Sequence, residues 1–225
     1  ETRKLEVGGR VFARETIVTG EGASVTIRLF HNNARWTLSE GKRRIKLAIL
    51  DLPSFYGDVD PGKRQADADV RRLLAKAVEQ GADAMVLDLS HNSGGILEQA
   101  VNISGLFLRS GDIVAVRDSR DATDYLPDTD RSVSFNGPLV VLISRLSASG
   151  AEIVAGALKD YHRAVIVGDS RTFGKGSVQT MMPLPPGFGA LKTTIGLYYL
   201  PGGASTQHSG VAADIVIPSL TDSDE

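Results

Sequence analysis

Residues 138–179 read PLVVLISRLSASGAEIVAGALKDYHRAVIVGDSRTFGKGSVQ, and this stretch decides the fold. The apolar run Leu139–Ile143 predicts a buried strand, and Ala164–Val167 predicts a second one. A break of small residues at 147–150 separates the first run from a predicted helix. The apolar face of that helix consists of Ile153, Val154, Ala157, Leu158 and Tyr161. Strand, helix and strand with short links indicate a βαβ unit with parallel strands.

The same alternation continues on both sides of this stretch. The other predicted strands are Lys46–Leu52, Ala84–Leu89, Ile113–Arg117, Leu191–Leu200 and Ala213–Ile217. The other predicted helices are 66–81 and Leu97–Leu108. In the first of these, an apolar stripe follows helical spacing at Val70, Leu73, Leu74, Ala77 and Val78, and Gly81 suits the C-terminal cap. Residues 118–136 are polar and predict an irregular surface segment. The fold class is therefore α/β.

The first 44 residues have a different character. They are predicted to be β-rich, with an alternating strand at Val25–Leu29 and a polar boundary at Gly41–Arg44. We therefore expect a small β-rich segment over 1–44 and an α/β core over 45–225.

Composition excludes several classes of protein. The chain has 225 residues, 42% hydrophobic and 23% charged, with a net charge of −2, which gives no electrostatic case for nucleic acid or an anionic membrane. No apolar run is long enough to span a bilayer, and the start ETRKLEVGGR is not an intact signal peptide. The absence of cysteine excludes disulfides, thiolate nucleophiles and cysteine metal sites. It fits an exported protein, although many cytosolic proteins also lack cysteine.

Three candidate sites are rejected on pattern. The segment Gly168–Ser177 has the wrong spacing for a phosphate-binding P-loop, because Gly176 follows its lysine. The four histidines show no metal-ligand spacing, and His91 fits a loop better than a base. The pair Asp58 and Asp60 is interpreted as a polar loop. We therefore expect no metal and no cofactor.

Ser149 and Lys175 form the strongest candidate pair. Ser149 lies where a strand passes into a helix, and Lys175 stands between two glycines. A serine hydroxyl needs a base to become a good nucleophile, and a neutral lysine amine is the recognised alternative to histidine. The motifs SxS and GKG are nevertheless common, so the pattern alone leaves a structural role open.

The lysine must lose its charge to act as a base. A free lysine with a pKa of about 10.4 is neutral in about one molecule in 2,500 at pH 7. Lowering the pKa to about 7 requires the charged form to be destabilised by roughly 4 to 5 kcal/mol. Desolvation in an apolar pocket can supply this free energy. Lys175 is therefore expected among apolar groups such as Phe173, without a carboxylate. Gln179, predicted to lie on the same strand face, could orient the amine without charging it.

Acyl transfer also needs donors for the developing oxyanion. Gly94 and Gly95 follow a predicted core strand and can offer unhindered backbone N–H groups. The competing interpretation is that they are only the turn before a helix.

Several blocks resemble the carboxy-terminal processing, or tail-specific, proteases, which are Ser–Lys serine endopeptidases. In chain order the blocks are IKLAILDLPSFYGD, LDLSHNSGG, PLVVLISRLSASGAEIVAGALKDYHRAVIVG, TFGKGSVQT and ALKTTIGLYYLPGGASTQHSGVAADIVIP, and they are collinear with the family. The resemblance implies a crotonase-like or ClpP-like α/β core with small β subdomains. This sequence departs from the family pattern at two places: it has SASGA where SASAS is common, and Ser90 where arginine is frequent. The stretch between Gly168 and Lys175 is one residue longer than in some members.

The resemblance also assigns roles by motif position. Ser149 would be the nucleophile, Lys175 the general base and Gln179 the residue that orients it. Gly94 and Gly95 fall in the oxyanion region. The positions that the family links to site integrity are Glu152, Asp160 and Thr172.

These observations predict a serine endopeptidase that cuts polypeptides near their C-termini through an acyl-enzyme. Its expected substrates are unstructured tails with apolar ends. The family resemblance alone implies a location in the periplasm or another exported compartment. Members of this family usually carry a PDZ module that binds the C-terminus of the substrate. Residues 1–44 are too short for a complete PDZ domain and are interpreted as a possible remnant of one or as linker strands. The resemblance therefore leaves open an adaptor or PDZ module outside this chain. The alternatives are a protease-like binding protein without turnover and an acyl-CoA enzyme of the crotonase fold.

Overall fold

The computed structural model describes residues 2–3, 16–19, 23–26, 35–40, 43–58, 60 and 62–217, with side chains from residue 45 onward. The predicted strand Val25–Leu29 begins within the observed strand β3, and its residues 27–29 lie outside the described part.

Among the described residues, nine strands form one large sheet in the order β1-β2-β3-β4-β5-β6-β9-β10-β13. Its strands are β1 (Thr2–Arg3), β2 (Thr16–Thr19), β3 (Ala23–Thr26), β4 (Arg35–Glu40), β5 (Arg43–Asp51), β6 (Ala84–Asp88), β9 (Leu139–Ile143), β10 (Val165–Gly168) and β13 (Ile215–Val216). The pairs from β2 to β5 are antiparallel, and those from β5 to β13 are parallel. The predicted parallel core is therefore confirmed.

The apolar strands form the centre of this sheet, with one face buried and the other half-buried. Strand β9 reads LVVLI, and its side chains alternate between buried and half-buried. Strand β6 has the same alternation. Near-continuous apolar runs are typical of parallel strands with covered faces.

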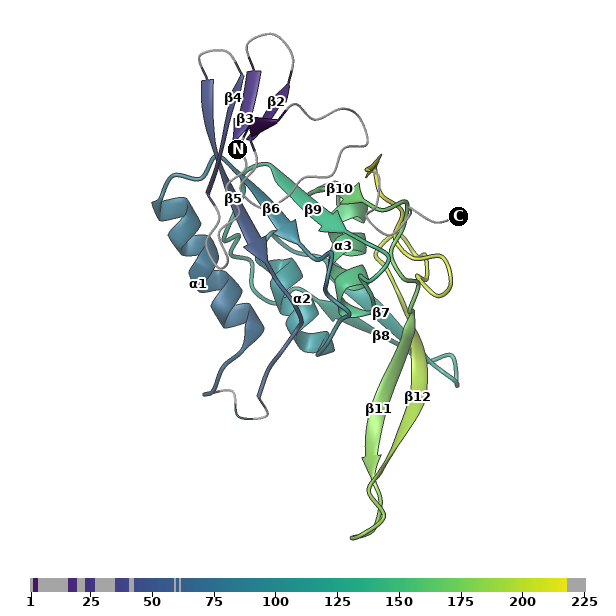
Figure 1. Ribbon diagram of the computed structural model, residues 1–225. Helices are drawn as coiled ribbons and strands as arrows, with labels where there is room; N and C mark the ends of the chain where they lie inside the picture. The colour runs from purple at the N-terminus through teal and green to yellow at the C-terminus, as the bar shows by residue number, and fades with distance from the viewer. Residues whose placement is uncertain are drawn as a thin grey trace.

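The helices are α1 (Ala66–Glu79), α2 (Leu97–Gly105) and α3 (Gly150–Asp160), and α2 packs between the other two (Figure 1). In α1 the predicted stripe is buried at Val70 and Leu74, whereas Val78 near its end is 51% exposed. Gly81 follows with a φ of +72°, as expected for a helix end. Helix α3 is buried from residue 150 to 158, since it contacts both β10 and β7.

A second sheet is antiparallel, with the order β11-β12-β7-β8. Its strands are β7 (Asp112–Asp118), β8 (Thr123–Pro127), β11 (Ser177–Pro183) and β12 (Ala190–Tyr199). The prediction that residues 118–136 are irregular is wrong for β8. This strand lies at the sheet edge with mostly exposed side chains, so it lacks the apolar alternation of a half-buried strand.

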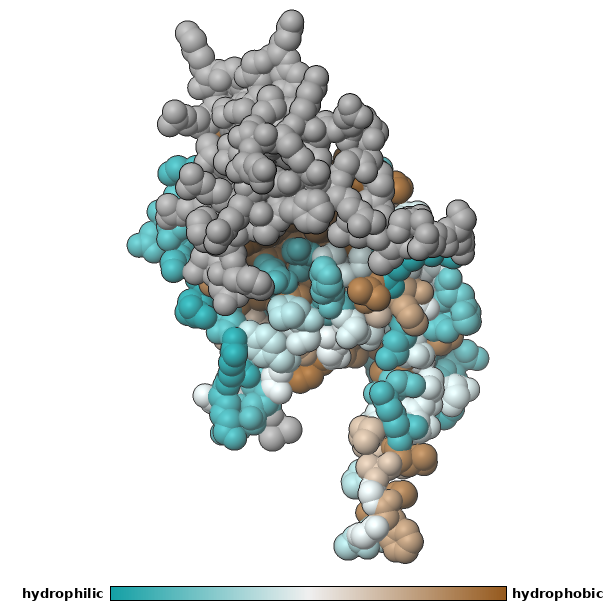
Figure 2. Space-filling model, viewed as in Figure 1, coloured by the Kyte–Doolittle hydropathy of each residue, from teal (hydrophilic) through white to brown (hydrophobic). Residues whose placement is uncertain are grey.

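The hairpin of β11 and β12 projects away from the body of the molecule (Figure 1). Its far end carries apolar surface (Figure 2), and Met181, Phe188 and Leu191 are among its exposed side chains.

The predicted α/β fold class is confirmed. The division at residue 44 stays a prediction. Strand β5 crosses that position and pairs with β4, so the backbone of the N-terminal segment extends the same sheet as the core.

The two ends of the α1 stripe should differ in their contribution to stability. Replacing the fully buried Leu74 by alanine should lower the free energy of unfolding by about 3 kcal/mol, because the smaller side chain leaves a cavity and its neighbours lose packing contacts. Val78→Ala should cost less than about 1 kcal/mol, because the side chain is largely in water. Urea unfolding followed by circular dichroism measures both, and equal losses would contradict this account of the core.

Candidate active site

Ser149 lies at the end of the connection from strand β9 of the large sheet to helix α3. It is the N-cap of this helix and has the unusual dihedrals φ 55° and ψ −115°. A non-glycine residue with positive φ costs about 1–3 kcal/mol, and such strain persists only where surrounding contacts impose it. The serine is half-buried, so a ligand can reach its side chain. A sharp strand-to-helix turn of this kind presents a nucleophilic serine in other enzyme folds.

Glu152 supplies the contacts that impose this geometry. Its carboxylate is fully buried and accepts the backbone N–H of Ser149 at 2.8 Å. It also accepts the N–H groups of Gly174 at 2.7 Å and Lys175 at 2.8 Å, and the Thr172 hydroxyl at 2.6 Å. One side chain therefore binds the serine and the lysine loop together, which fits the supporting role predicted for Glu152 and Thr172.

Lys175 lies in the connection from β10 to β11. A second loop, residues 204–211, cradles this connection. The N–H of His208 donates to the carbonyl of Gly174, and the N–H of Gly176 donates to the side chain of Gln207, both at 2.8 Å. Thr172 exchanges two hydrogen bonds with Val211. The backbone around the lysine is thus fixed on several sides.

The side chain of Lys175 departs from one expectation. It is half-buried, but Phe173 is 65% exposed, so that ring does not shelter the amine. The backbone N–H of Phe173 donates to the carbonyl of Ser147, and the side chain lies at the surface. Lys175 Nζ has no hydrogen bond or ion pair to any residue that the structure describes, Ser149 included. Among the described residues, the only carboxylate bonded to Lys175 is that of Glu152, and it binds the backbone N–H rather than the amine.

Gln179 is exposed on β11, and its side chain forms no hydrogen bond within the described part of the chain. Lys175 precedes β11, which begins at Ser177, so the strand alternation itself covers only residues 177 and 179. The register with β12 shifts between Val178 and Gln179, where β12 carries one extra residue. The role of Gln179 stays a prediction.

Gly94 and Gly95 pack directly against the serine turn. A Cβ on Gly94 would lie 2.8 Å from Ser149 Cβ and 3.2 Å from the nitrogen of Gly150. Asn92, which sequence reasoning passed over, holds this loop. Its buried amide donates to the carbonyl of Leu52 and accepts the N–H of Gly94, both at 2.8 Å. Its position just before the glycine pair was the available signal.

Two backbone N–H groups here have no acceptor among the described residues. They belong to Gly95 and to Gly150, the residue after the serine. The N–H of Gly94 is occupied by Asn92, so only one member of the predicted glycine pair offers a free donor. Unoccupied N–H groups beside a serine can bind a developing oxyanion.

Tyr198 is a second residue that sequence reasoning missed. Its hydroxyl lies against the carbonyl oxygens of Ser149 and Lys175 and accepts a hydrogen bond from Thr206. Burial, followed by the nearby charge of Glu152, raises the pKa of Tyr198 well above its usual value. No local pattern separates it from the other apolar residues of β12.

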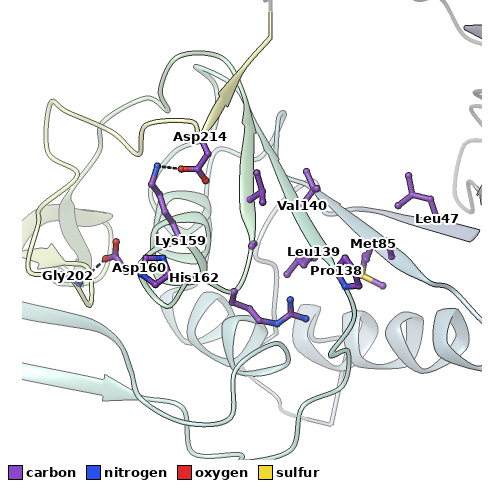
Figure 3. Close-up of a pocket in the computed structure, with 14 residues that line it drawn as sticks. Leu47, Met85, Pro138, Leu139, Val140, Lys159, Asp160, His162, Gly202 and Asp214 are labelled. Carbon is purple, nitrogen blue, oxygen red and sulfur yellow. Dashed lines mark hydrogen bonds and ion pairs between the residues drawn. The ribbon is translucent and has the colours of Figure 1, made fainter. Parts of the chain in front are cut away.

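Asp160 does not lie with the other predicted site residues. It ends α3 at the opposite end from Ser149 and accepts the N–H of Gly202 at 2.8 Å. It lines a cavity of about 730 Å³ at the amino ends of β6, β9 and β10, beside the Lys159–Asp214 ion pair (Figure 3). Ligands of parallel sheets bind at the carboxyl ends, where Ser149 lies, so this cavity is separate from the candidate active site.

Over the described residues, no group of three or more histidine and acidic side chains could hold a metal ion. None of the described helices is long and apolar enough to cross a membrane.

Known proteins resemble this chain in sequence. The model of peptidase family S41 matches residues 46–217. The tail-specific protease of Haemophilus influenzae is 40% identical over 186 residues, which cover 80% of this chain and 26% of that protein. The carboxy-terminal-processing protease of Bartonella bacilliformis is 42% identical over 152 residues, covering 67% of this chain and 34% of that protein. The chain thus spans well under half of these relatives.

Solved structures agree with the fold. The photosystem II D1 C-terminal processing protease superposes with a TM-score of 0.67 at 26% identity, over 83% of this chain and 55% of that one. An S41 protease structure from Bacteroides fragilis gives a TM-score of 0.65 at 16% identity, over 86% of this chain and 58% of that one. This second likeness shows the fold alone.

The carboxylate of Glu152 should stabilise the fold far more than the neutral amide of a glutamine at the same position. Glu152→Gln leaves one oxygen for four donors and places an NH₂ group against N–H groups. We expect the free energy of unfolding to fall by about 2–4 kcal/mol. Glu98→Gln, on an exposed side chain in the first turn of α2, should cost less than about 1 kcal/mol. Urea titrations compare the two, and a similar small loss in both would show that the Glu152 contacts contribute little.

Proposed function

Because this chain belongs to peptidase family S41, we propose that it is a serine endopeptidase that cleaves polypeptides near their C-termini through an acyl-enzyme. In this proposal Ser149 is the nucleophile and Lys175 is the general base.

One observation carries the proposal, and it is the position of the buried Glu152. Its carboxylate binds the backbone of Ser149 and of Lys175 at once, so residues far apart in the sequence are held on either side of one group. Ser149 and Lys175 are both half-buried, within reach of a substrate. Nothing in a purely structural role requires a strained serine beside a lysine whose amine has no described partner.

The chemistry follows in two half-reactions. The uncharged amine of Lys175 takes the proton of Ser149 as Oγ attacks the scissile carbonyl carbon. The C–N bond then breaks, and the same proton passes from Nζ to the leaving amine, which gives the acyl-enzyme. Water next attacks the ester carbonyl carbon while Lys175 takes its proton; the bond from that carbon to Oγ then breaks, Oγ receives the proton from Nζ, and the product leaves with a new C-terminal carboxyl group. The long lysine side chain allows Nζ to approach Oγ when a peptide is bound. Gln179 would orient the amine at that stage.

The oxyanion of each tetrahedral intermediate needs hydrogen-bond donors. The free N–H groups of Gly95 and Gly150 are proposed for this role, with Gly94 as the residue whose small size brings the two loops together. One such donor contributes roughly 10²–10³ in kcat in other acyl-transfer enzymes.

The proposed substrates are unstructured polypeptide tails with apolar ends. An extended peptide can add to an exposed sheet edge, and β11 is an edge strand that begins two positions after Lys175. The S41 relatives are much longer than this chain, so an adaptor or a PDZ module elsewhere is proposed for tail recognition. We place the protein in the periplasm or another exported compartment, a location compatible with the absence of cysteine.

The dyad is tested by removing each partner. Ser149→Ala and Lys175→Ala should each abolish cleavage of an unfolded protein with an apolar C-terminal tail, because one variant lacks the nucleophile and the other the base. Exposed residues of the same types, tested as Ser119→Ala and Lys76→Ala, should leave the rate unchanged. Mass spectrometry of the products gives the rate and the cleavage positions. Full activity in both site variants would show that neither residue performs the reaction, whereas no cleavage by the unmodified protein would favour the binding-protein or acyl-CoA alternatives.

The oxyanion loop is tested by a pair of glycines. Gly94 and Gly187 both have positive φ, but a Cβ on Gly94 meets Ser149, whereas one on Gly187 has nothing within 4 Å. Both alanine variants carry the backbone strain, and only Gly94→Ala should lose activity, by about 10²-fold or more in kcat. Circular dichroism checks that both variants fold. Equal activity in the two variants would remove this loop from the mechanism.

A further inference from the structure

Tyr198 belongs to the second sheet, and its side chain contacts both the serine turn and the lysine loop. It lies on β12, and its side chain is only 1% exposed. Its hydroxyl group is 3.2 Å from the carbonyl oxygen of Ser149 and closer still to that of Lys175. Its backbone N–H donates to the carbonyl of Gly176 at 2.9 Å.

The contacts of Tyr198 complement those of Glu152. Glu152 accepts the N–H groups of Ser149 and Lys175, and Tyr198 lies against the carbonyl groups of the same two residues. The carbonyl of Ser149 also accepts the N–H groups of Glu152 and Ile153, so the single hydroxyl proton of Tyr198 matters most for the nearer carbonyl, that of Lys175. The pair of side chains therefore holds the backbone of the lysine loop against the serine turn.

The hydroxyl is set up to remain a donor. Thr206, also fully buried, donates its own hydroxyl proton to the Tyr198 oxygen at 2.8 Å. Accepting this bond strengthens the one that Tyr198 donates, because hydrogen bonds in a chain polarise one another. The raised pKa keeps the phenol protonated at any pH at which a peptidase would be assayed.

We propose that Tyr198 is a positioning residue, whose buried hydroxyl holds the lysine loop against the Ser149 turn by donating to the carbonyl of Lys175. This inference rests on the proposed function, because it assigns Tyr198 a role in the same reaction. Tyr198 does not touch the reacting atoms. Its effect is to hold the lysine loop so that Nζ can meet Oγ when a peptide is bound.

The test compares two neighbouring tyrosines. Tyr198→Phe keeps the buried ring and removes the hydroxyl. Tyr199→Phe changes a half-buried residue whose ring lies under Arg117 at 5.0 Å, away from the site contacts. Thr206→Val serves as a second variant, since it removes only the hydrogen bond donated to Tyr198. The readouts are kcat and KM on an unfolded polypeptide, and amide hydrogen exchange of residues 172–177.

We expect Tyr198→Phe to lower kcat about tenfold or more with KM changed less than twofold, since misplaced catalytic groups slow the chemical step. Exchange at residues 172–177 should rise while exchange in α1 stays the same. Thr206→Val should show a smaller change in the same direction, and Tyr199→Phe should match the unmodified protein.

Two results would overturn the inference. One is unchanged kcat and exchange in Tyr198→Phe, and the other is a loss expressed entirely as a higher KM. Failure of the proposed function looks different. If Ser149→Ala cleaves as fast as the unmodified protein, the dyad is wrong, whereas the exchange measurement still decides whether the Tyr198 hydroxyl holds the lysine loop.

Discussion

The buried carboxylate of Glu152 is the constraint on which the rest of the site depends. A charged group that is fully removed from water is costly unless it is well hydrogen-bonded. Glu152 meets this requirement with donors from Ser149, Thr172, Gly174 and Lys175, and it lies in the first turn of α3, where the helix dipole favours negative charge. The charge is stabilised only when these segments are together, so the carboxylate enforces the assembly of the site.

The site lies at the junction of the two sheets. Ser149 follows β9 of the parallel sheet, and the connection that carries Lys175 runs from β10 to β11 of the antiparallel sheet. A connection between sheets cannot use a regular strand ladder, yet its buried backbone groups still need partners. Glu152, Tyr198 and the loop 204–211 supply them. Helix α3 beneath the site is buried along most of its length, which gives the serine a rigid support.

Local patterns in the sequence were sufficient for the core. Apolar runs predicted β6, β9 and β10, and helical spacing predicted α1 and α3, because burial on a regular element repeats with that element's period. The serine at a strand-to-helix turn was predicted in the same way. Strand β8 was missed because an exposed edge strand needs no apolar alternation, and its pairing with β7 is set by the partner strand.

The sequence by itself determined the parallel core, the place of Ser149 at the head of a helix, and the family to which the chain belongs. Only the tertiary structure decided which groups surround that serine. It brought in Asn92 and Tyr198, left Phe173 at the surface, and placed Asp160 at the far end of α3. The physical reason is that these contacts join segments distant in the chain, and their geometry is fixed by packing of whole elements, which no local periodicity encodes.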